Sequence, residues 1–292
     1  MLAINWAQVM KDRYSVTLGL HKRQIVVPGA QTQQIDLESV DKLTRCIEEA
    51  SPHIVIHAAG LTSVDQCELD PLLAHHLNVT LATNVANACA ITGVGLVHIS
   101  TDQLFCGKES FADENQPVAP INVYGQTKAE AEHQVLGANP KSLVIRTNFY
   151  GWGTSYRQSF SDIVINALRA KTNLILFQDL FYTPILVETL ALAVHDLIDH
   201  NANGVFNVVG DERISKNEFG LMIAQEFGLE FGEFRTGFFL DQTNLVSRPR
   251  DMSLSNQKVC NFLGRKLGST KEHLARLHQQ ETDWATQKLK VL

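Results

Sequence analysis

Three absences narrow the class of protein that this sequence of 292 residues encodes. No apolar run reaches the roughly 18 residues that a membrane-spanning helix needs, so we expect no membrane segment. The first residues show no cationic segment followed by an apolar stretch, so we expect no secretory signal. The formal net charge of −6 leaves no basic excess of the kind that binds nucleic acid. A cytoplasmic protein with neither a membrane nor a nucleic-acid partner is therefore predicted.

Cysteine and histidine also supply little that would organise a metal site or a disulfide framework. The five cysteines are odd in number and scattered, with no C-x-x-C pair, which is typical of reduced thiols in the cytosol. The eleven histidines form no metal-like cluster. We therefore predict no bound metal.

A further absence concerns the start of the fold. Doubly wound domains that bind dinucleotides begin with a strand and a glycine-rich turn ahead of the first helix. Here apolar residues at positions 2, 6, 9 and 10 indicate a helix at once, and an apolar strand follows at 15–20. We therefore predict a doubly wound, Rossmann-type parallel α/β fold that lacks its usual first strand and glycine loop, with a smaller α/β substrate lobe.

The most informative stretch runs from 96 to 128. An apolar strand at 96–99 ends in Ser100, Thr101 and Asp102, and a polar loop then leads to a helix that carries Tyr124 and Lys128 one turn apart on one face. Open α/β sheets bind ligands at the carboxyl ends of their strands. A hydroxyl, a phenol and an ammonium group at such an edge can protonate a carbonyl oxygen. Taken alone, however, a Y-x-x-x-K pair is more often an ordinary pair on a helix surface.

Three segments carry a resemblance to a known family: 99–102 (Ile-Ser-Thr-Asp), 122–128 (Asn-Val-Tyr-Gly-Gln-Thr-Lys) and 146–151 (Arg-Thr-Asn-Phe-Tyr-Gly). Together they resemble the extended short-chain dehydrogenase/reductase superfamily, and within it the dTDP-4-dehydrorhamnose reductase family. The resemblance covers nearly the whole chain. It implies NAD(P)H-dependent reduction of a nucleotide-linked 4-keto-6-deoxyhexose, a step in the biosynthesis of dTDP-rhamnose and related sugar nucleotides.

The resemblance also implies roles for individual residues. Tyr124 is the expected acid, Lys128 is expected to lower its pKa and to reach the nicotinamide ribose, and Thr101 is expected to hydrogen-bond the substrate oxygen. The family usually has Tyr where Gln103 stands and Trp where Phe149 stands, which leaves the hexose open. The residues expected to contact substrate are Thr101, Asp102, Gln103, Asn148, Phe149 and Arg248.

The expected cofactor site includes residues that follow two of the predicted strands. Small residues after the strand 54–57 would let a dinucleotide approach the backbone, and basic residues after the strand 15–20 suit a 2′-phosphate, which predicts NADP(H) rather than NAD(H). The basic residues are also compatible with a solvated turn, and the acid at 36 with a helix N-terminus. Besides Tyr124 and Lys128, the predicted contacts are His21, Lys22, Arg23, Asp36, Leu37, Ala58, Ala59, Gly60 and Thr62.

Two domains are predicted, together with a homodimer. The dinucleotide-binding domain comprises 1–147 and 185–200, and the lobe that binds the sugar nucleotide comprises 148–184 and 201–292. Because the superfamily carries Gly-x-x-Gly-x-x-Gly before its first helix, we expect the natural protein to begin roughly 15–20 residues before Met1. Otherwise the chain closes the gap and binds no dinucleotide. The reading frame upstream of Met1 distinguishes these alternatives.

Two other functions remain open. A non-catalytic binding or regulatory subunit with the same fold, as in the regulatory subunit of methionine adenosyltransferase, is favoured by the missing glycine loop. A sugar-nucleotide epimerase is a weaker alternative. A dehydratase would need an Asp-Glu pair directly after the catalytic Thr, whereas Asp102 is followed by Gln103.

Overall fold

A parallel sheet flanked by helices forms the framework, so the predicted α/β class is confirmed. The computed structural model describes residues 1–21, 23–231, 235–242, 244–283, 286–287 and 290. The strands are β1 Thr17–Leu20, β2 Gln31–Gln34, β3 Ile54–His57, β4 Gly95–Ile99, β5 Leu143–Arg146, β6 Phe149–Tyr150, β7 Ile175–Phe177, β8 Phe181–Tyr182, β9 Ile185–Leu186, β10 Gly204–Asn207, β11 Ile214–Ser215 and β12 Arg235–Gly237.

The helices lie between these strands in alternation through the first half of the chain. A π-helical turn, η1 His76–Thr80, joins α4 to α5, and a 3-10 turn, η2 Phe239–Asp241, follows β12. The α-helices are α1 Leu2–Met10, α2 Val40–Ala50, α3 Val64–Leu69, α4 Pro71–His75, α5 Leu81–Thr92, α6 Val123–Ala138, α7 Phe160–Ala170, α8 Val187–Asp199, α9 Lys216–Glu226, α10 Gln257–Leu263 and α11 Thr270–Gln280.

Besides the short parallel pairs β6–β9 and β7–β12, two separate parallel sheets form the framework. One has the order β10-β5-β4-β3, and the other pairs β1 with β2. The strands of the larger sheet are short apolar runs, as expected where helices cover both faces. Among the described residues no hydrogen-bonded pairing joins β1 to β3.

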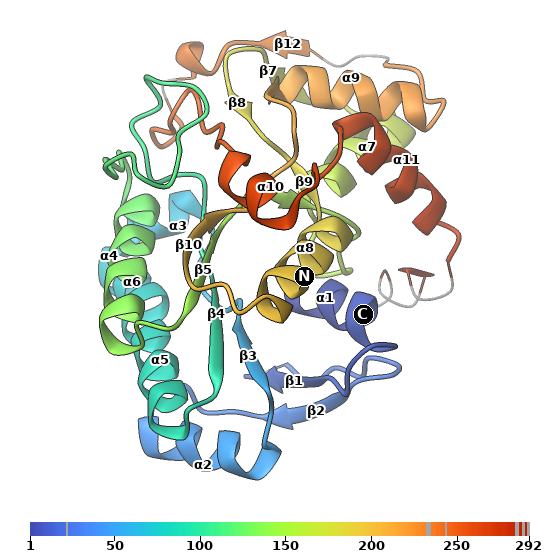
Figure 1. The fold of residues 1–292 in the computed structure, drawn as a ribbon. Coiled ribbons are helices and arrows are strands. Elements are labelled where there is room, and N and C mark those ends of the chain that lie inside the picture. Colours follow the sequence, from blue (N-terminus) through green and yellow to red (C-terminus); the bar gives the residue numbers. More distant parts are fainter. Residues whose placement is uncertain (22, 232–234, 243, 284–285, 288–289, 291–292) are drawn as a thin grey trace.

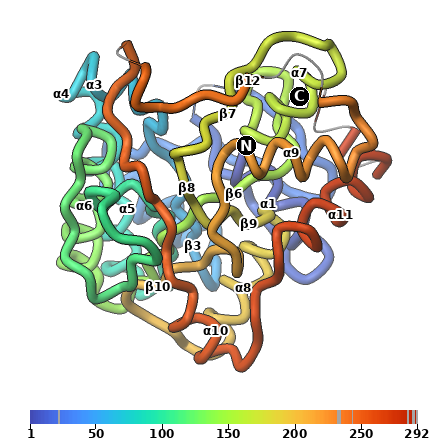
Figure 2. The backbone as a smooth tube through the Cα atoms, turned by 90° about the horizontal axis from the view of Figure 1, so that it is seen from above, coloured from blue at the N-terminus to red at the C-terminus, as the bar shows by residue number. Residues whose placement is uncertain are grey.

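Helices cover both faces of the larger sheet (Figure 1). On one face, α2, α5 and α6 pack on Leu96 and Val144. On the other face, α1 and α8 pack on Val97, Ile99 and Ile145. Seen from above, α3 to α6 gather on one side of the molecule, while α7, α9 and α11 lie on the opposite side (Figure 2). The strands β4 and β5 are therefore central, and their carboxyl ends lie under the later segments of the chain.

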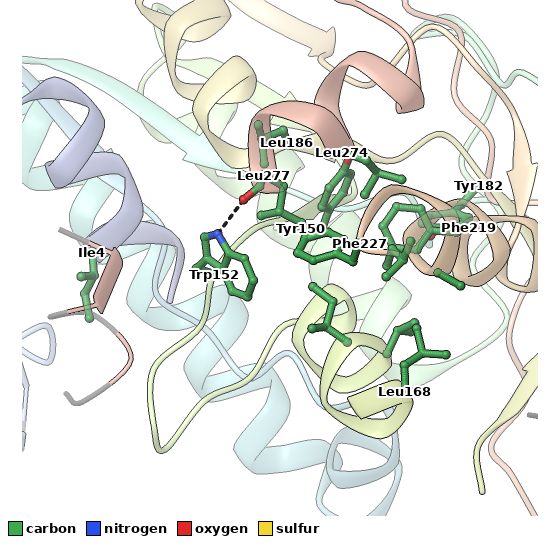
Figure 3. Packing of buried hydrophobic residues seen from close by; sticks show 14 of the residues in the cluster. Ile4, Tyr150, Trp152, Leu168, Tyr182, Leu186, Phe219, Phe227, Leu274 and Leu277 are labelled. Atoms are coloured by element: carbon green, nitrogen blue, oxygen red, sulfur yellow. Dashed lines mark hydrogen bonds between the residues drawn. The ribbon is translucent and has the colours of Figure 1, made fainter. Parts of the chain in front are cut away.

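A second apolar cluster packs these later segments against the first part of the chain. Tyr150 and Phe219 meet edge to face with ring centroids 4.8 Å apart, and Trp152 Nε1 donates a hydrogen bond of 3.0 Å to the carbonyl of Leu277 on α11 (Figure 3). The same cluster includes Leu18 of β1. It therefore joins α7, α9 and α11 to the first part of the chain and fixes the start of α9.

Candidate active site

The elements of the predicted site converge where β4 ends. Thr101 and Asp102 follow β4 directly, and α6 begins opposite them because Asn122 Oδ1 accepts a hydrogen bond of 2.8 Å from the Gly125 backbone N–H. Tyr124 and Lys128 thus lie on the first turns of α6, with only 8% and 6% of their surfaces exposed. The hydroxyl, phenol and ammonium groups share one buried region.

Thr101 lies between Asp102 and the phenol. Its Oγ1 donates to Asp102 Oδ1 over 3.1 Å and accepts a hydrogen bond of 3.3 Å from the Gln103 backbone N–H. The Thr101 side chain also lies close enough to the Tyr124 hydroxyl to act on it, in the direction that lowers the pKa of the phenol. The hydroxyl predicted to share the substrate oxygen is therefore next to the predicted acid.

The acid–base balance of the pair differs from the sequence-based prediction. Burial raises the pKa of Tyr124 to about 12, and the charge of Asp102 adds to this, while Thr101 and Arg157 oppose it. The net direction is opposite to the predicted lowering by Lys128. Lys128 donates instead to the Ile99 carbonyl over 2.7 Å and approaches His98 Nε2 at 3.2 Å. Burial lowers the pKa of Lys128 to about 8, against the opposing charge of Glu132.

Asp102 faces the lobe formed by the later segments. Its Oδ2 accepts a hydrogen bond from Asn148 Nδ2, and burial raises its pKa to about 6. The half-buried Lys216, first residue of α9, has its ammonium 3.3 Å from the Tyr182 ring centroid and 4.4 Å from that of Phe160. Burial lowers the pKa of Lys216 to about 7, although the charge of Asp102 opposes this. Lys216 thus adds a cation to the site.

Sequence reasoning missed Lys216. The Ser215–Glu218 capping box was predictable, and the structure confirms it. It places Lys216 at the start of a helix, but no local pattern shows that this helix start meets Asp102.

The other predicted substrate residues lie around this centre. Gln103 Oε1 accepts from Asn122 Nδ2 over 3.2 Å, so its side chain is held at the start of α6. Arg248 Nη2 pairs with Asp65 Oδ2 over 3.2 Å and lies close enough to Lys216 to lower its pKa. Phe149 is half-buried on β6, where it pairs with Ile185 of β9.

The loop after β3, at the edge beside α6, contains Ala58, Ala59, Gly60 and Thr62. A side chain at Gly60 would place its Cβ only 2.8 Å from Asn78 Oδ1. Asn78 accepts from the Leu61 N–H over 2.7 Å and donates to Leu61 O over 3.1 Å and to Thr127 Oγ1 over 3.0 Å. Asn78 lies in η1, and π-helical turns are frequent at functional sites. Its role was not recognised from the sequence.

At the predicted adenine end of the site, several residues already interact with other parts of the chain. Asp36 is paired with Lys42 over 2.9 Å, and Leu37 offers its carbonyl to Asn84 over 3.0 Å. Arg23 stacks on the Tyr156 ring at 3.7 Å. His21 lies at a bend after β1, and Lys22 falls outside the described residues.

Comparison with known proteins agrees with this geometry. Residues 15–282 match the family model described as RmlD substrate binding domain. The chain belongs to the RmlD substrate-binding-domain family. This family, and with it the extended short-chain dehydrogenase/reductase superfamily, was predicted from the segments around Thr101, Tyr124 and Arg146, and the prediction is confirmed.

Three relatives illustrate the range of the RmlD family. The chain is 29% identical to the "Probable low-salt glycan biosynthesis reductase Agl14" of Haloferax volcanii, over 96% of this chain and 94% of that one. It is 29% identical to methionine adenosyltransferase 2 subunit beta of Pongo abelii, over 78% and 70%. The crystal structure of dTDP-4-dehydrorhamnose reductase from Bacillus anthracis in complex with NADP superposes with a TM-score of 0.79 at 26% identity, over 86% and 90%.

Two absences among the described residues concern membranes and metal ions. Within the described ranges, no helix is long and apolar enough to cross a membrane. Within the same ranges, no group of three or more His, Cys, Asp or Glu side chains is arranged to hold a metal ion.

The buried carboxylate predicts a pH-dependent gain in stability. The free energy of unfolding of Asp102→Asn should be about 1–3 kcal/mol higher than that of the parent at pH 8, because burial disfavours the charged form of the Asp102 carboxyl. The pKa of about 6 in the folded protein lies above the unfolded value, so the carboxyl stabilises the fold while protonated. That contribution is lost as the pH rises through 6.

Urea denaturation of parent and variant between pH 4 and 8 measures this difference. The gap should widen up to about pH 6 and stay constant above it. A gap that does not change with pH would show that Asp102 is not the titrating group.

Proposed function

We propose that this protein reduces a nucleotide-linked 4-keto-6-deoxyhexose with NADP(H) in preference to NAD(H). The observation that carries the proposal is the buried cluster of Tyr124, Thr101 and Asp102, with Lys128 one turn along α6. A phenol next to a hydroxyl, beside a carboxylate and an ammonium, suits protonation of a forming alkoxide. The similarity to a glycan biosynthesis reductase and to a dTDP-4-dehydrorhamnose reductase supports the same reaction class.

In this proposal Tyr124 protonates the substrate oxygen while Thr101 shares a hydrogen bond with that oxygen. A phenol with a pKa of about 12 stays protonated throughout the neutral range, so the acid is available in every cycle. Asp102, Asn148 and Lys216 contact the sugar from both lobes, and Gln103 and Arg248 border it. Phe149 is proposed as part of the same wall.

The residues at the inner half of the site fit a nicotinamide dinucleotide. When bound, the reduced nicotinamide supplies the hydride. Ala58, Ala59 and Gly60 offer backbone without bulky side chains, and the loop is fixed by Asn78. Thr62 accepts a hydrogen bond from Arg157, which places a cation at the same edge.

The outer half of the site offers weaker support. The printed chain contains no Gly-x-x-Gly-x-x-Gly turn to approach a pyrophosphate. We propose that the separation of β1 from β3 marks the position of the strand that such a turn would follow. Arg23 and His21, after β1, support a preference for the 2′-phosphate.

The proposal is tested by incubating the protein with NADPH or NADH and a dTDP-linked 4-keto-6-deoxyhexose. We expect loss of reduced-nicotinamide absorbance with formation of a dTDP-6-deoxyhexose, and a higher kcat/KM with NADPH. Equal kcat/KM for the two cofactors would contradict the preference, and binding of the sugar nucleotide without turnover would contradict the reaction.

One alternative retains specific support. A non-catalytic binding subunit is favoured by the similarity to methionine adenosyltransferase 2 subunit beta and by the absent glycine motif. Such a protein would bind the nucleotide sugar, measured by calorimetry, and form no product with either cofactor. Tyr124→Phe would then leave the binding of the nucleotide sugar unchanged.

A further inference from the structure

Two histidines form a buried pair beside the proposed site. His57 on β3 and His98 on β4 are register partners, so their side chains project from the same face of the sheet. Their rings are stacked with centroids 5.3 Å apart, and the two Nδ1 atoms are 3.1 Å apart. His98 has no exposed surface and His57 has 6%. One ring therefore donates to the other through its Nδ1 atom.

Lys128 determines which ring is the donor. Its ammonium lies 3.2 Å from His98 Nε2, and an ammonium has three N–H donors and no acceptor. His98 Nε2 must therefore be the acceptor and carry no proton while Lys128 is charged. Burial lowers the pKa of His98 well below its usual value, and the Lys128 charge lowers it further, so the ring is neutral.

The remaining protons follow in order. A neutral His98 without a proton on Nε2 carries it on Nδ1, and Nδ1–H donates to His57 Nδ1. His57 is also neutral, because burial lowers its pKa to about 3, so its proton is on Nε2. Within the part of the chain that the structure describes, His57 Nε2 is buried without a hydrogen-bond partner. The chain thus runs in one direction, from Lys128 through His98 to His57.

We infer that His98 is a positioning residue for Lys128 and that His57 supports it by accepting the Nδ1 proton of the tautomer that can accept from the ammonium. Two of the three N–H bonds of Lys128 are then engaged, one by the Ile99 carbonyl and one by His98. The third is left for the active site. Outer groups that orient metal ligands typically change activity about 10–100-fold when removed, and we expect an effect at the lower end of that range for His98.

The groups around Lys128 define what else acts on it. Glu132, on the same helix, raises the Lys128 pKa, and Arg146 of β5 already pairs with Glu132 over 2.7 Å. From β3 and β4, the groups that face it are the two neutral imidazoles. The histidine pair therefore supplies an uncharged acceptor, whereas Glu132 supplies the nearby negative charge.

The tautomers can be tested without any enzyme assay. In ¹⁵N-labelled protein at neutral pH, long-range ¹H–¹⁵N spectra should show His98 protonated at Nδ1 and His57 protonated at Nε2. A proton on Nε2 of His98 would overturn the inference. This measurement is independent of the proposed function, whereas the kinetic test that follows rests on it.

The kinetic test compares three variants. His98→Phe should lower kcat about 10-fold with little change in KM, and should shift the Lys128 limb of the pH profile to lower pH, because a buried ammonium has lost an acceptor. His98→Gln, whose amide oxygen can accept in place of Nε2, should recover most of the loss. The control is His195→Phe, another buried histidine, which accepts from Trp6 Nε1 over 3.0 Å and should leave kcat unchanged.

Three outcomes separate the possibilities. An unchanged pH profile in His98→Phe, or no recovery in His98→Gln, would show that the pair only packs the core. If His98→Phe does not fold, Lys128→Met should convert the single His98 tautomer into a mixture, because the ammonium that keeps the proton off Nε2 is gone, and a retained single tautomer would contradict the inference. If the parent has no reductase activity, the Lys128 pKa read from side-chain NMR replaces the kinetics. The predicted shift would then uphold the network although the proposed function has failed.

Discussion

Tyr124→Phe is expected to lower kcat of the proposed reduction by about 10²–10⁴-fold, the usual contribution of general acid catalysis. The substitution removes one hydroxyl and keeps the ring, which packs with Val64, Cys67 and Ala74. The stability should fall by no more than about 1 kcal/mol, for the lost polar interactions of one hydroxyl. Steady-state kinetics with NADPH and thermal unfolding measure the two effects separately.

Tyr150→Phe is the matched control, because it deletes the same atom from a buried tyrosine outside the site. The Tyr150 hydroxyl is buried and has no hydrogen-bond partner among the described residues, so its loss should change neither activity nor stability appreciably. Activity of Tyr124→Phe within a few-fold of the parent would remove Tyr124 from the mechanism. Equal losses in the two variants would point to a general effect on packing.

Arg146→Met is expected to lower the free energy of unfolding by about 3–5 kcal/mol, because it leaves a buried carboxylate without its partner. Arg146 Nε and Nη2 donate to Glu132 over 3.0 and 2.7 Å, and each of the two side chains is only 6% exposed. Glu132 also faces Lys128 from within α6. Urea denaturation at neutral pH measures the loss.

Two further variants decide whether burial is the cause. Arg146→Met combined with Glu132→Leu should recover most of the stability, because no charge is then left unpaired. Arg276→Met removes a two-bonded pair with Glu188 at the surface and should cost less than about 1 kcal/mol. A loss at Arg146 no larger than that at Arg276 would contradict the argument.

The central site was predictable because its parts are local. The apolar run ending at Ile99 predicts a strand, and helical spacing alone places Tyr124 and Lys128 on one face. The position of Thr101 beside Tyr124 then follows from the rule that ligands gather at strand ends. The structure buries Thr101 and Tyr124 close enough together for Thr101 to act on the phenol, while their roles remain predictions.

Other parts depend on contacts that the sequence does not encode locally. The strand β2, Gln31–Gln34, is polar and mostly exposed, so no apolar pattern indicates it. The pairing of His57 with His98 depends on the register between two strands, which periodicity does not specify. The pKa of Tyr124 was misjudged because burial outweighs the nearby charge, and the burial of one phenol is a property of the whole fold.

The amide of Asn78 links two parts of the site thermodynamically. It holds the loop after β3 through Leu61 and helix α6 through Thr127, with three hydrogen bonds of 2.7 to 3.1 Å. A ligand that moves the loop therefore works against the bonds that orient α6. If a rearrangement of α6 weakens ligand binding at the loop by a certain free energy, then a bound ligand makes that rearrangement less favourable by the same free energy. Ligand binding at the loop and the orientation of Tyr124 are thus coupled, and Asn78 is the residue that couples them.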